Sequence, residues 1–252
     1  MDTLLYITWD AAKDKPLGNI IMDEEPIFDL AIFDYSGTIK GKYTHFRLNG
    51  ISGIITCAVH SEVSEGKGDI IRYISNIDRL QEPEYIGIID DDILIRVSDI
   101  NRAVRIAERE NFTSFQPSLA RCSYYSHGFT LNHPNSSFRK VDWVEIMMPV
   151  LKSKLMRAVK PFLEYSISSW GLDCYAFPML AFIEGIGNNH AVIDASIAAH
   201  IRRIRSGHTV YRNGLTASQE KDNVKEACKR YLASIGYNWE NCEIIKPLFS
   251  II

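Results

Sequence analysis

Short apolar runs alternate with amphipathic stretches along the first half of the chain. Residues 4–8, 30–33 and 85–89 are short and rich in aliphatic side chains, which is typical of buried strands. Positions 70–80 predict a helix. Residues 98–110 predict another, with an N-cap candidate at its start and apolar residues at helical spacing. This alternation favours an α/β fold of three layers around a mixed, mostly parallel sheet.

The second half predicts further elements around one irregular stretch. Residues 123–137 are rich in turn-forming and aromatic residues, which indicates a functional loop or an irregular hairpin. The other elements are strands at 114–116 (ended by Pro117), 141–148 and 191–194, and helices at 152–162, 174–183 and 217–235. No repeat or linker divides the chain, so we expect one α/β domain over residues 1–204 with a helical extension, residues 205–252, packed on it.

Bulk properties exclude several classes of protein. The chain has 252 residues, of which 46% are hydrophobic and 23% charged, as in ordinary globular proteins. The net charge of −3 offers no basic field for nucleic acid. Five cysteines without a CxxC pair indicate reduced thiols and a cytoplasmic protein.

Hydropathy predicts neither a signal peptide nor a transmembrane segment, since no apolar run approaches about 18 residues. The basic run at 152–160 leaves a peripheral contact with the inner face of the membrane open. The solvated face of a helix is the commoner explanation for such a run.

Three aspartates, Asp90, Asp91 and Asp92, follow the strand predicted at 85–89. Clustered carboxylates repel one another unless a cation or several donors compensate them, and their oxygens suit Mg²⁺ or Mn²⁺. Ligands of open α/β sheets bind at the carboxyl ends of strands. A solvated acidic turn is the alternative, but the apolar residues on both sides of the triplet favour a site. There is no GxGxxG after the first strand and no P-loop, so dinucleotide binding and NTPase activity are not supported.

The order of six short motifs resembles a known family. They are Ile89-Asp-Asp-Asp-Ile, Gln116-Pro-Ser-Leu, Ser123-Tyr-Tyr-Ser-His, Val144-Glu-Ile-Met-Met-Pro, Ser169-Trp-Gly-Leu-Asp, and Val192-Ile-Asp-Ala followed by His200. Over about residues 28–204 the chain resembles a plant and bacterial family, formerly described as lysine-ketoglutarate reductase related, that is glycosyltransferase-like. The resemblance implies the A-type glycosyltransferase fold.

The resemblance also implies a donor site. Asp90 and Asp92 would match the Asp-x-Asp element that holds Mn²⁺ or Mg²⁺ against a nucleoside diphosphate, with Asp92 the more direct ligand and Asp90 alternatively at the ribose. Asp91 would hold a water molecule beyond the direct ligands of the metal, or point away. His200 would complete the metal shell, and His190 is its competitor. Asp194 would orient the histidine or be structural, and Lys67 would contact the diphosphate.

An acceptor site is implied as well. Asp173 would be the general base of an inverting transfer, although a carboxylate at a helix N-terminus is nearly as good an explanation. Trp170 would stack on the acceptor, or else be a core side chain. Tyr125 and His127 would lie on the acceptor side, together with Tyr124. Glu145 stands among apolar residues and needs a partner, which is either the acceptor or a cation, Arg139 or Lys140.

The predicted function is therefore a metal-dependent transfer of a sugar from a nucleotide-diphosphate donor to a carbohydrate or glycolipid acceptor, in bacterial surface polysaccharide assembly. The alternatives are a non-catalytic carbohydrate- or nucleotide-binding module with the same fold, and a metal-assisted nucleotide-sugar hydrolase.

Overall fold

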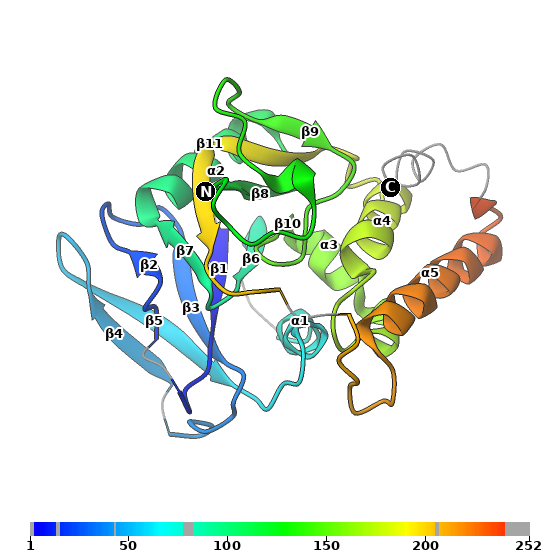
Figure 1. Cartoon of the computed structure of the whole chain (residues 1–252), viewed down its shortest axis with the longest axis horizontal. Helices are drawn as coiled ribbons and strands as arrows, with labels where there is room; N and C mark the ends of the chain where they lie inside the picture. Colours follow the sequence, from blue (N-terminus) through cyan, green and yellow to red (C-terminus); the bar gives the residue numbers. More distant parts are fainter. Residues whose placement is uncertain (1–2, 14–15, 43, 78–82, 205–206, 240–252) are drawn as a thin grey trace.

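The structure, a computed structural model, describes residues 3–13, 16–42, 44–77, 83–204 and 207–239. In this part of the chain, eleven strands form one mixed sheet in the order β2-β7-β11-β8-β10-β6-β1-β3-β5-β4, with β9 paired to β11 (Figure 1). The strands are β1 Thr3–Trp9, β2 Ile20–Ile21, β3 Asp29–Asp34, β4 His45–Asn49, β5 Ile54–Ser61, β6 Tyr85–Ile89, β7 Ile93–Arg96, β8 Ser114–Leu119, β9 Arg139–Val141, β10 Val150–Lys152 and β11 His190–His200.

Parallel pairing at the centre of the sheet positions the site. β1 lies between β3 and β6 and is parallel to both, with Leu5 opposite Leu30 on one side and Gly87 on the other. A side chain at position 87 would meet Leu5, because a Cβ built there lies 2.4 Å from the leucine side chain. The carboxyl ends of these three strands therefore share one edge of the sheet, where the chain continues into Asp10, Tyr35 and Asp90.

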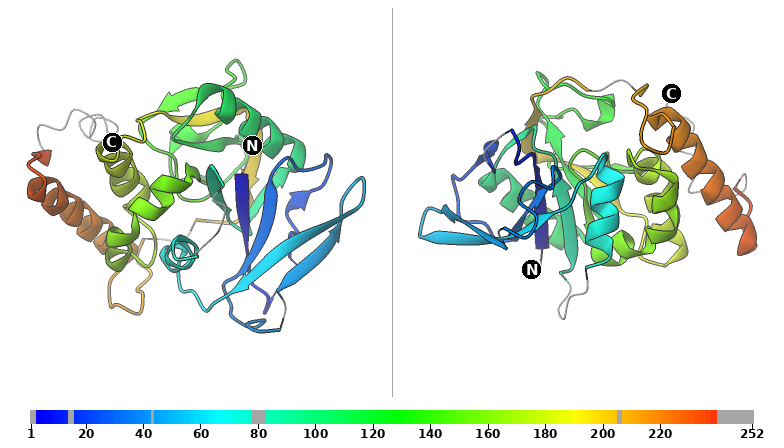
Figure 2. Two further views of the ribbon diagram at one scale, coloured as in Figure 1. Left: turned by 180° about the vertical axis from the view of Figure 1, so that it is seen from behind. Right: turned by 90° about the horizontal axis from the view of Figure 1, so that it is seen from below.

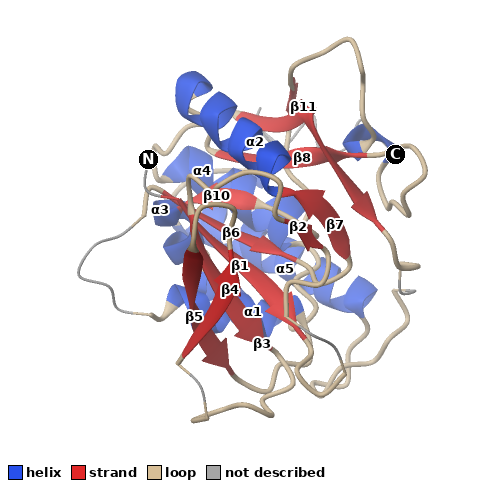
Figure 3. Cartoon of the chain, turned by 90° about the vertical axis from the view of Figure 1, so that its left-hand side faces the viewer, coloured by secondary structure: helices blue, strands red, loops and turns tan. Residues whose placement is uncertain are grey.

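Helices cover both faces of the sheet (Figures 2 and 3). They are α1 Lys67–Ser75, α2 Val97–Glu110, α3 Ser153–Ala158, α4 Phe177–Ile183 and α5 Ala217–Ser234, with 3₁₀ turns at Gly128–Thr130 and Lys160–Tyr165 and a π turn at Leu172–Ala176. Side chains of α2 pack in one apolar cluster, and those of α1, α3, α4 and α5 pack in the other. Alternation along β1 explains the two clusters, since Leu4 and Tyr6 face the second and Leu5 and Ile7 face the first.

The α/β fold class with a mixed sheet is confirmed, and most elements lie where the pattern predicts them. Two predicted elements are longer than expected. β8 continues through Pro117, because β11 accompanies it as far as Leu119 while β10 on its other side reaches only Phe115. β11 continues as far as His200 and there pairs with β7, which the pattern did not indicate.

Three other predictions need correction. The strand predicted at 141–148 is wrong, because β9 ends at Val141 and the buried segment after it has no ladder until β10. The helix predicted at 152–162 changes to a 3₁₀ turn at Lys160, next to Pro161, which lacks an N–H. The helix predicted at 70–80 ends at Ser75, and part of its predicted end, 78–82, lies outside the described residues. The β4–β5 hairpin and β2 were not predicted.

None of the helices in the described ranges combines the length and the apolar character that a membrane span requires. The four described cysteines are free thiols, and Cys242 lies beyond the described ranges.

Candidate active site

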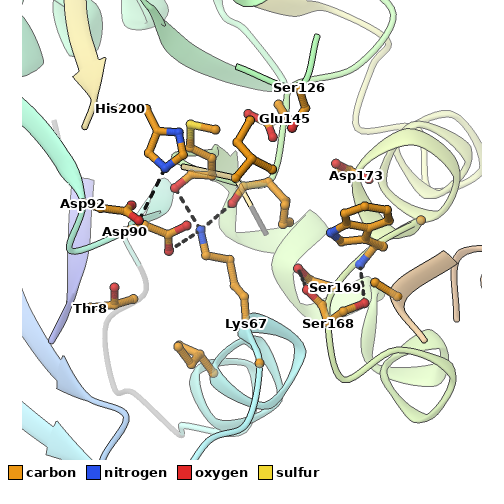
Figure 4. A pocket seen from close by; sticks show the side chains of 18 of the residues that line it. Thr8, Lys67, Asp90, Asp92, Ser126, Glu145, Ser168, Ser169, Asp173 and His200 are labelled. Atoms are coloured by element: carbon orange, nitrogen blue, oxygen red, sulfur yellow. Dashed lines mark hydrogen bonds and ion pairs between the residues drawn. The ribbon is translucent and has the colours of Figure 1, made fainter. Parts of the chain in front are cut away.

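A cavity of about 540 Å³ opens at the sheet edge where β1 and β6 end. Its size is that of a small-molecule site. The start of α1, the segment before β10 and the π turn before α4 supply its other walls (Figure 4). Nine of the residues predicted for the site line it: Lys67, Asp90, Asp91, Asp92, His127, Glu145, Trp170, Asp173 and His200.

The three aspartates have three different partners. The Asp90 carboxylate forms an ion pair with the ammonium group of Lys67 at 2.7 Å. Asp91 accepts from the Tyr35 hydroxyl at 3.1 Å, and its N–H donates to Thr8 Oγ1 at 3.0 Å. Asp92 Oδ2 lies 3.4 Å from Nε2 of His200. The carboxylate repulsion expected from the sequence is thus relieved by a hydrogen bond or an ion pair at each position.

Lys67 is a buried cation at the floor of the cavity. Its ammonium group donates to the carbonyls of Ile146 and Met147 and pairs with Asp90. An ammonium group has three N–H bonds, and these three partners use all of them. The predicted contact between Lys67 and a diphosphate is therefore not supported by this geometry. Lys67 supplies charge to the cavity and fixes Asp90. Burial raises the pKa of Asp90, and Lys67 works against that rise.

His200 and its competitor His190 lie at opposite ends of β11. His190 is buried beside Ser114, with Nδ1 at 2.6 Å from the serine hydroxyl, and burial lowers its pKa to about 4. His200 lines the cavity, and its Nδ1 faces the carbonyl of Tyr124 at 3.0 Å. Of the two, only His200 is placed to act with Asp92. Asp194 does not orient it, since that carboxylate binds Arg139 at 2.7 Å and the N–H of His133.

The chemistry of the Asp92–His200 pair fits a divalent cation. The carbonyl of Tyr124 can only accept, so we assign the hydrogen of the imidazole to Nδ1. Nε2 then faces Asp92 either with a second proton or with a lone pair that can bind a cation. Adjacent ligands of an ion held at about 2.1 Å lie roughly 3 Å apart, close to the separation of these two atoms.

Other protein ligands for such an ion are not assembled. In the described ranges, no group of three or more His, Cys, Asp and Glu side chains is arranged to hold a metal. Asp90, predicted as a third ligand, pairs with Lys67 instead. A divalent ion held by two protein ligands can take its remaining ligands from substrate phosphates and water. Burial works to lower the pKa of His200, but the hydrogen bond to Asp92, the negative charge of Asp92, the Tyr124 carbonyl and Glu145 together raise it.

Asp173 stands in the opposite wall of the cavity. It lies in the π turn after Gly171, whose φ of +88° and close approach to the backbone of Lys221 favour glycine there. The carboxylate is buried and accepts from the N–H of Cys174 at 2.8 Å and from the N–H of Ile146. Burial raises its pKa. Asp173 is therefore a fixed carboxylate with increased affinity for a proton, as a general base requires.

A hydrogen-bonded loop precedes Asp173. Glu220 of α5, fully buried, accepts from the N–H groups of Ile167 and Ser168 at 3.0 and 2.8 Å and from Asn213. Trp170 at the end of this loop lines the cavity and is half-buried, so it is neither a core side chain nor fully exposed.

Aromatic residues cover the side of the cavity near Ser126. His127 lies 4.8 Å from the ring of Trp143 and 5.7 Å from that of Phe129. Tyr124 and Tyr125 are exposed and do not line the cavity, although the carbonyl of Tyr124 fixes His200. Trp143 was not predicted, because its position within an expected strand concealed its exposure to a cavity.

Three cations that follow β11 in the sequence complete the walls of the cavity. Arg202 lies 3.6 Å from Asp91 and 3.7 Å from Asp92, and Arg203 lines the same cavity. Lys221 of α5 lines it too, although the residues beyond 204 were expected to be an appendage. Arg205, the third arginine of this short stretch, lies outside the described residues.

Comparisons with known proteins bear on the fold. No family model matches the sequence, and no curated protein matches it. A crystal structure of S. aureus TarS superposes with a TM-score of 0.50 at 11% identity, over 96% of this chain and 45% of the TarS chain. The chain therefore spans less than half the length of that protein. A structure of TarS residues 1–349 in complex with UDP-GlcNAc gives a TM-score of 0.45 at 10% identity, over 98% of this chain and 79% of the other.

Proposed function

We propose that this protein transfers a sugar from a nucleoside-diphosphate donor to a hydroxyl group of a carbohydrate or glycolipid acceptor. One observation carries the proposal. The Asp92–His200 pair and the buried carboxylate of Asp173 come from distant parts of the chain and line one cavity. The likeness in fold to TarS supports it, and the narrower resemblance to the plant and bacterial family remains a prediction.

The donor diphosphate would bind on the side of the cavity formed by Asp92, His200 and Arg202. Asp92 and His200 are the residues that would hold a divalent ion, Mn²⁺ or Mg²⁺. Such an ion, when bound, supplies positive charge to the leaving diphosphate. Arg202 and Arg203 add fixed positive charge on the same side. Asp91 and Asp90 would act through the groups that they hold, Tyr35 and Lys67.

Asp173 would act on the acceptor. As the acceptor oxygen bonds to the anomeric carbon, its proton passes to the Asp173 carboxylate. The bond from the anomeric carbon to the diphosphate breaks, and its electron pair leaves with the nucleoside diphosphate. A single displacement of this kind inverts the anomeric centre. The rings of Trp170 and Trp143 line the cavity and would offer faces for the acceptor sugar.

The proposal is tested by binding and turnover in the presence of Mn²⁺. We expect UDP or another nucleoside diphosphate to raise the melting temperature only when Mn²⁺ or Mg²⁺ is present, and Asp92→Ala to abolish that rise. Asp173→Asn should bind nucleotide like the parent but turn over about 10² to 10⁴ times more slowly. Asp29→Ala is the matched control, because Asp29 is exposed at the opposite end of β3.

Two outcomes would overturn the proposal. One is the absence of any metal-dependent stabilisation by nucleoside diphosphates or nucleotide sugars. The other is an Asp92→Ala variant that binds nucleotide as well as the parent. Product analysis by NMR separates transfer from hydrolysis, since a hydrolase releases free sugar at the same rate whether or not an acceptor is added.

A further inference from the structure

Glu145 is a buried carboxyl group that the proposed mechanism does not use. Only 6% of the residue is exposed, and it lines the cavity. Its Oε2 has no hydrogen-bond partner among the described residues. Neither cation considered from the sequence serves it, since Arg139 binds Asp194 and Lys140 is exposed on β9. A buried carboxyl oxygen without a partner is costly, so an observed one indicates that a ligand completes it.

Several hydrogen bonds hold the backbone around Glu145. The Glu145 N–H donates to the side chain of Gln116, and the Ile146 N–H to Asp173. Lys67 binds the carbonyls of Ile146 and Met147, and the N–H of Asp90 also donates to that of Met147. The side-chain oxygen is thus left unsatisfied in a segment whose backbone is held by several hydrogen bonds. That is the arrangement of a pre-positioned binding group.

Glu145 lies between the two halves of the site. Figure 4 shows it between His200 on one side and Asp173 on the other. The charges that act on it come from both sides, from Asp173 and from Lys67, Asp90 and His200. In an inverting transfer the sugar lies between the leaving diphosphate and the base, since attack comes from the face opposite to the leaving group. This position of Glu145 favours a contact with the transferred sugar over the two partners expected from the sequence, the acceptor and a cation.

We infer that Glu145 hydrogen-bonds a hydroxyl or amide group on the sugar being transferred and thereby selects the donor sugar. This inference rests on the proposed function. The group recognised is neutral, because Asp173 already places negative charge beside Glu145, whereas the charge of Asp90 is paired with Lys67. Donors with a hydroxyl or acetamido group at that position are accepted, and uronic acids with a carboxylate there are rejected.

The test compares a nucleotide with its sugar derivative in the full-length protein. With Mn²⁺ present, affinities for UDP and UDP-GlcNAc, and for a panel of other nucleotides and their sugars, are measured by calorimetry. We expect Glu145→Leu to lose about 10- to 100-fold in affinity for the preferred nucleotide sugar. Its affinity for the free nucleotide should change less than about twofold. Glu145→Gln keeps a donor and an acceptor and should retain most of the affinity. Asp142→Leu, an acidic-to-apolar change outside the cavity, is the matched control.

Deoxy analogues of the preferred donor identify the group that is read. The analogue lacking that group should bind the parent more weakly, but should bind Glu145→Leu no more weakly than the complete donor does. The inference is overturned if Glu145→Leu binds the nucleotide sugar like the parent, or if it loses nucleotide and nucleotide sugar equally. If no nucleotide binds the parent protein at all, the proposed function itself fails, and the two failures are thereby distinguished.

Discussion

At the scale of single residues, burial of Glu145 has a consequence for stability. Burial raises the pKa of this carboxyl to about 8, with Asp173 adding to the rise, from an ordinary value of 4.5. The folded protein therefore holds a proton that the unfolded chain releases between these two values. The contribution of Glu145 to the free energy of unfolding is therefore fully present below about pH 4.5, and it is lost as the pH rises to about 8.

The measurement is urea denaturation from pH 5 to 9. Each unit of pKa difference corresponds to about 1.4 kcal/mol, so the parent should lose several kcal/mol relative to Glu145→Gln across this range. Because Gln does not titrate, the difference between the two free energies of unfolding isolates Glu145 from other groups. Parallel pH profiles for the two proteins would contradict a raised pKa.

Residue types near a strand end could be predicted from the sequence, but their pairing could not. The aspartate triplet was found because acidic residues after an apolar run are a local signal, whereas His200 was named only because of the family resemblance. Whether Asp90 would face a metal or Lys67 depends on how α1 lies against the segment before β10, which no local pattern encodes. Nothing in the sequence around Lys221 indicated a cavity.

At the scale of elements, irregular segments were the least predictable. The segment between β9 and β10 is apolar enough to predict a strand. Its backbone is bonded to the side chains of Lys67 and Gln116 and, at Met147 and Pro149, to the N–H groups of Asp90 and Ile88, without forming a strand ladder. Long-range side-chain partners of this kind leave no periodic trace, whereas α5 was predicted nearly to the residue from the spacing of its apolar positions. The structure adds a capping box at Thr216.

The contact between α5 and the loop before Asp173 yields an element-scale prediction. Glu220→Gln replaces one of the two acceptor oxygens by a donor that faces backbone N–H groups. We expect a loss of about 2–4 kcal/mol in the free energy of unfolding, because hydrogen bonds to a buried charge are lost. Turnover should fall while nucleotide affinity holds, since the loop leads to Trp170 and Asp173. Glu226→Gln, on the same helix with its side chain 55% exposed, should change stability by less than about 0.5 kcal/mol. Equal effects of the two changes would contradict this role of Glu220.

At the scale of the whole molecule, α5 belongs to the same core as the sheet. Val224, Cys228 and Leu232 are buried in the cluster that contains Leu4 of β1 and Ile88 of β6. Helix α5 also brings Lys221 to the cavity. Its folding should therefore be coupled to that of the sheet, although α5 follows residue 204, where the α/β domain was predicted to end.

Leu232→Ala tests that coupling. Removing a fully buried leucine side chain costs about 2–5 kcal/mol. At about 2–4 °C per kcal/mol for a domain of this size, the melting temperature should fall by roughly 5–15 °C. If α5 and the sheet share one core, calorimetry shows a single transition that moves as a whole, and tryptophan fluorescence follows it. Lys229→Ala on the exposed side of the helix should leave the transition in place. A separate early transition that alone responds to Leu232→Ala would mean that α5 unfolds independently, and that the cavity loses Lys221 before the sheet melts.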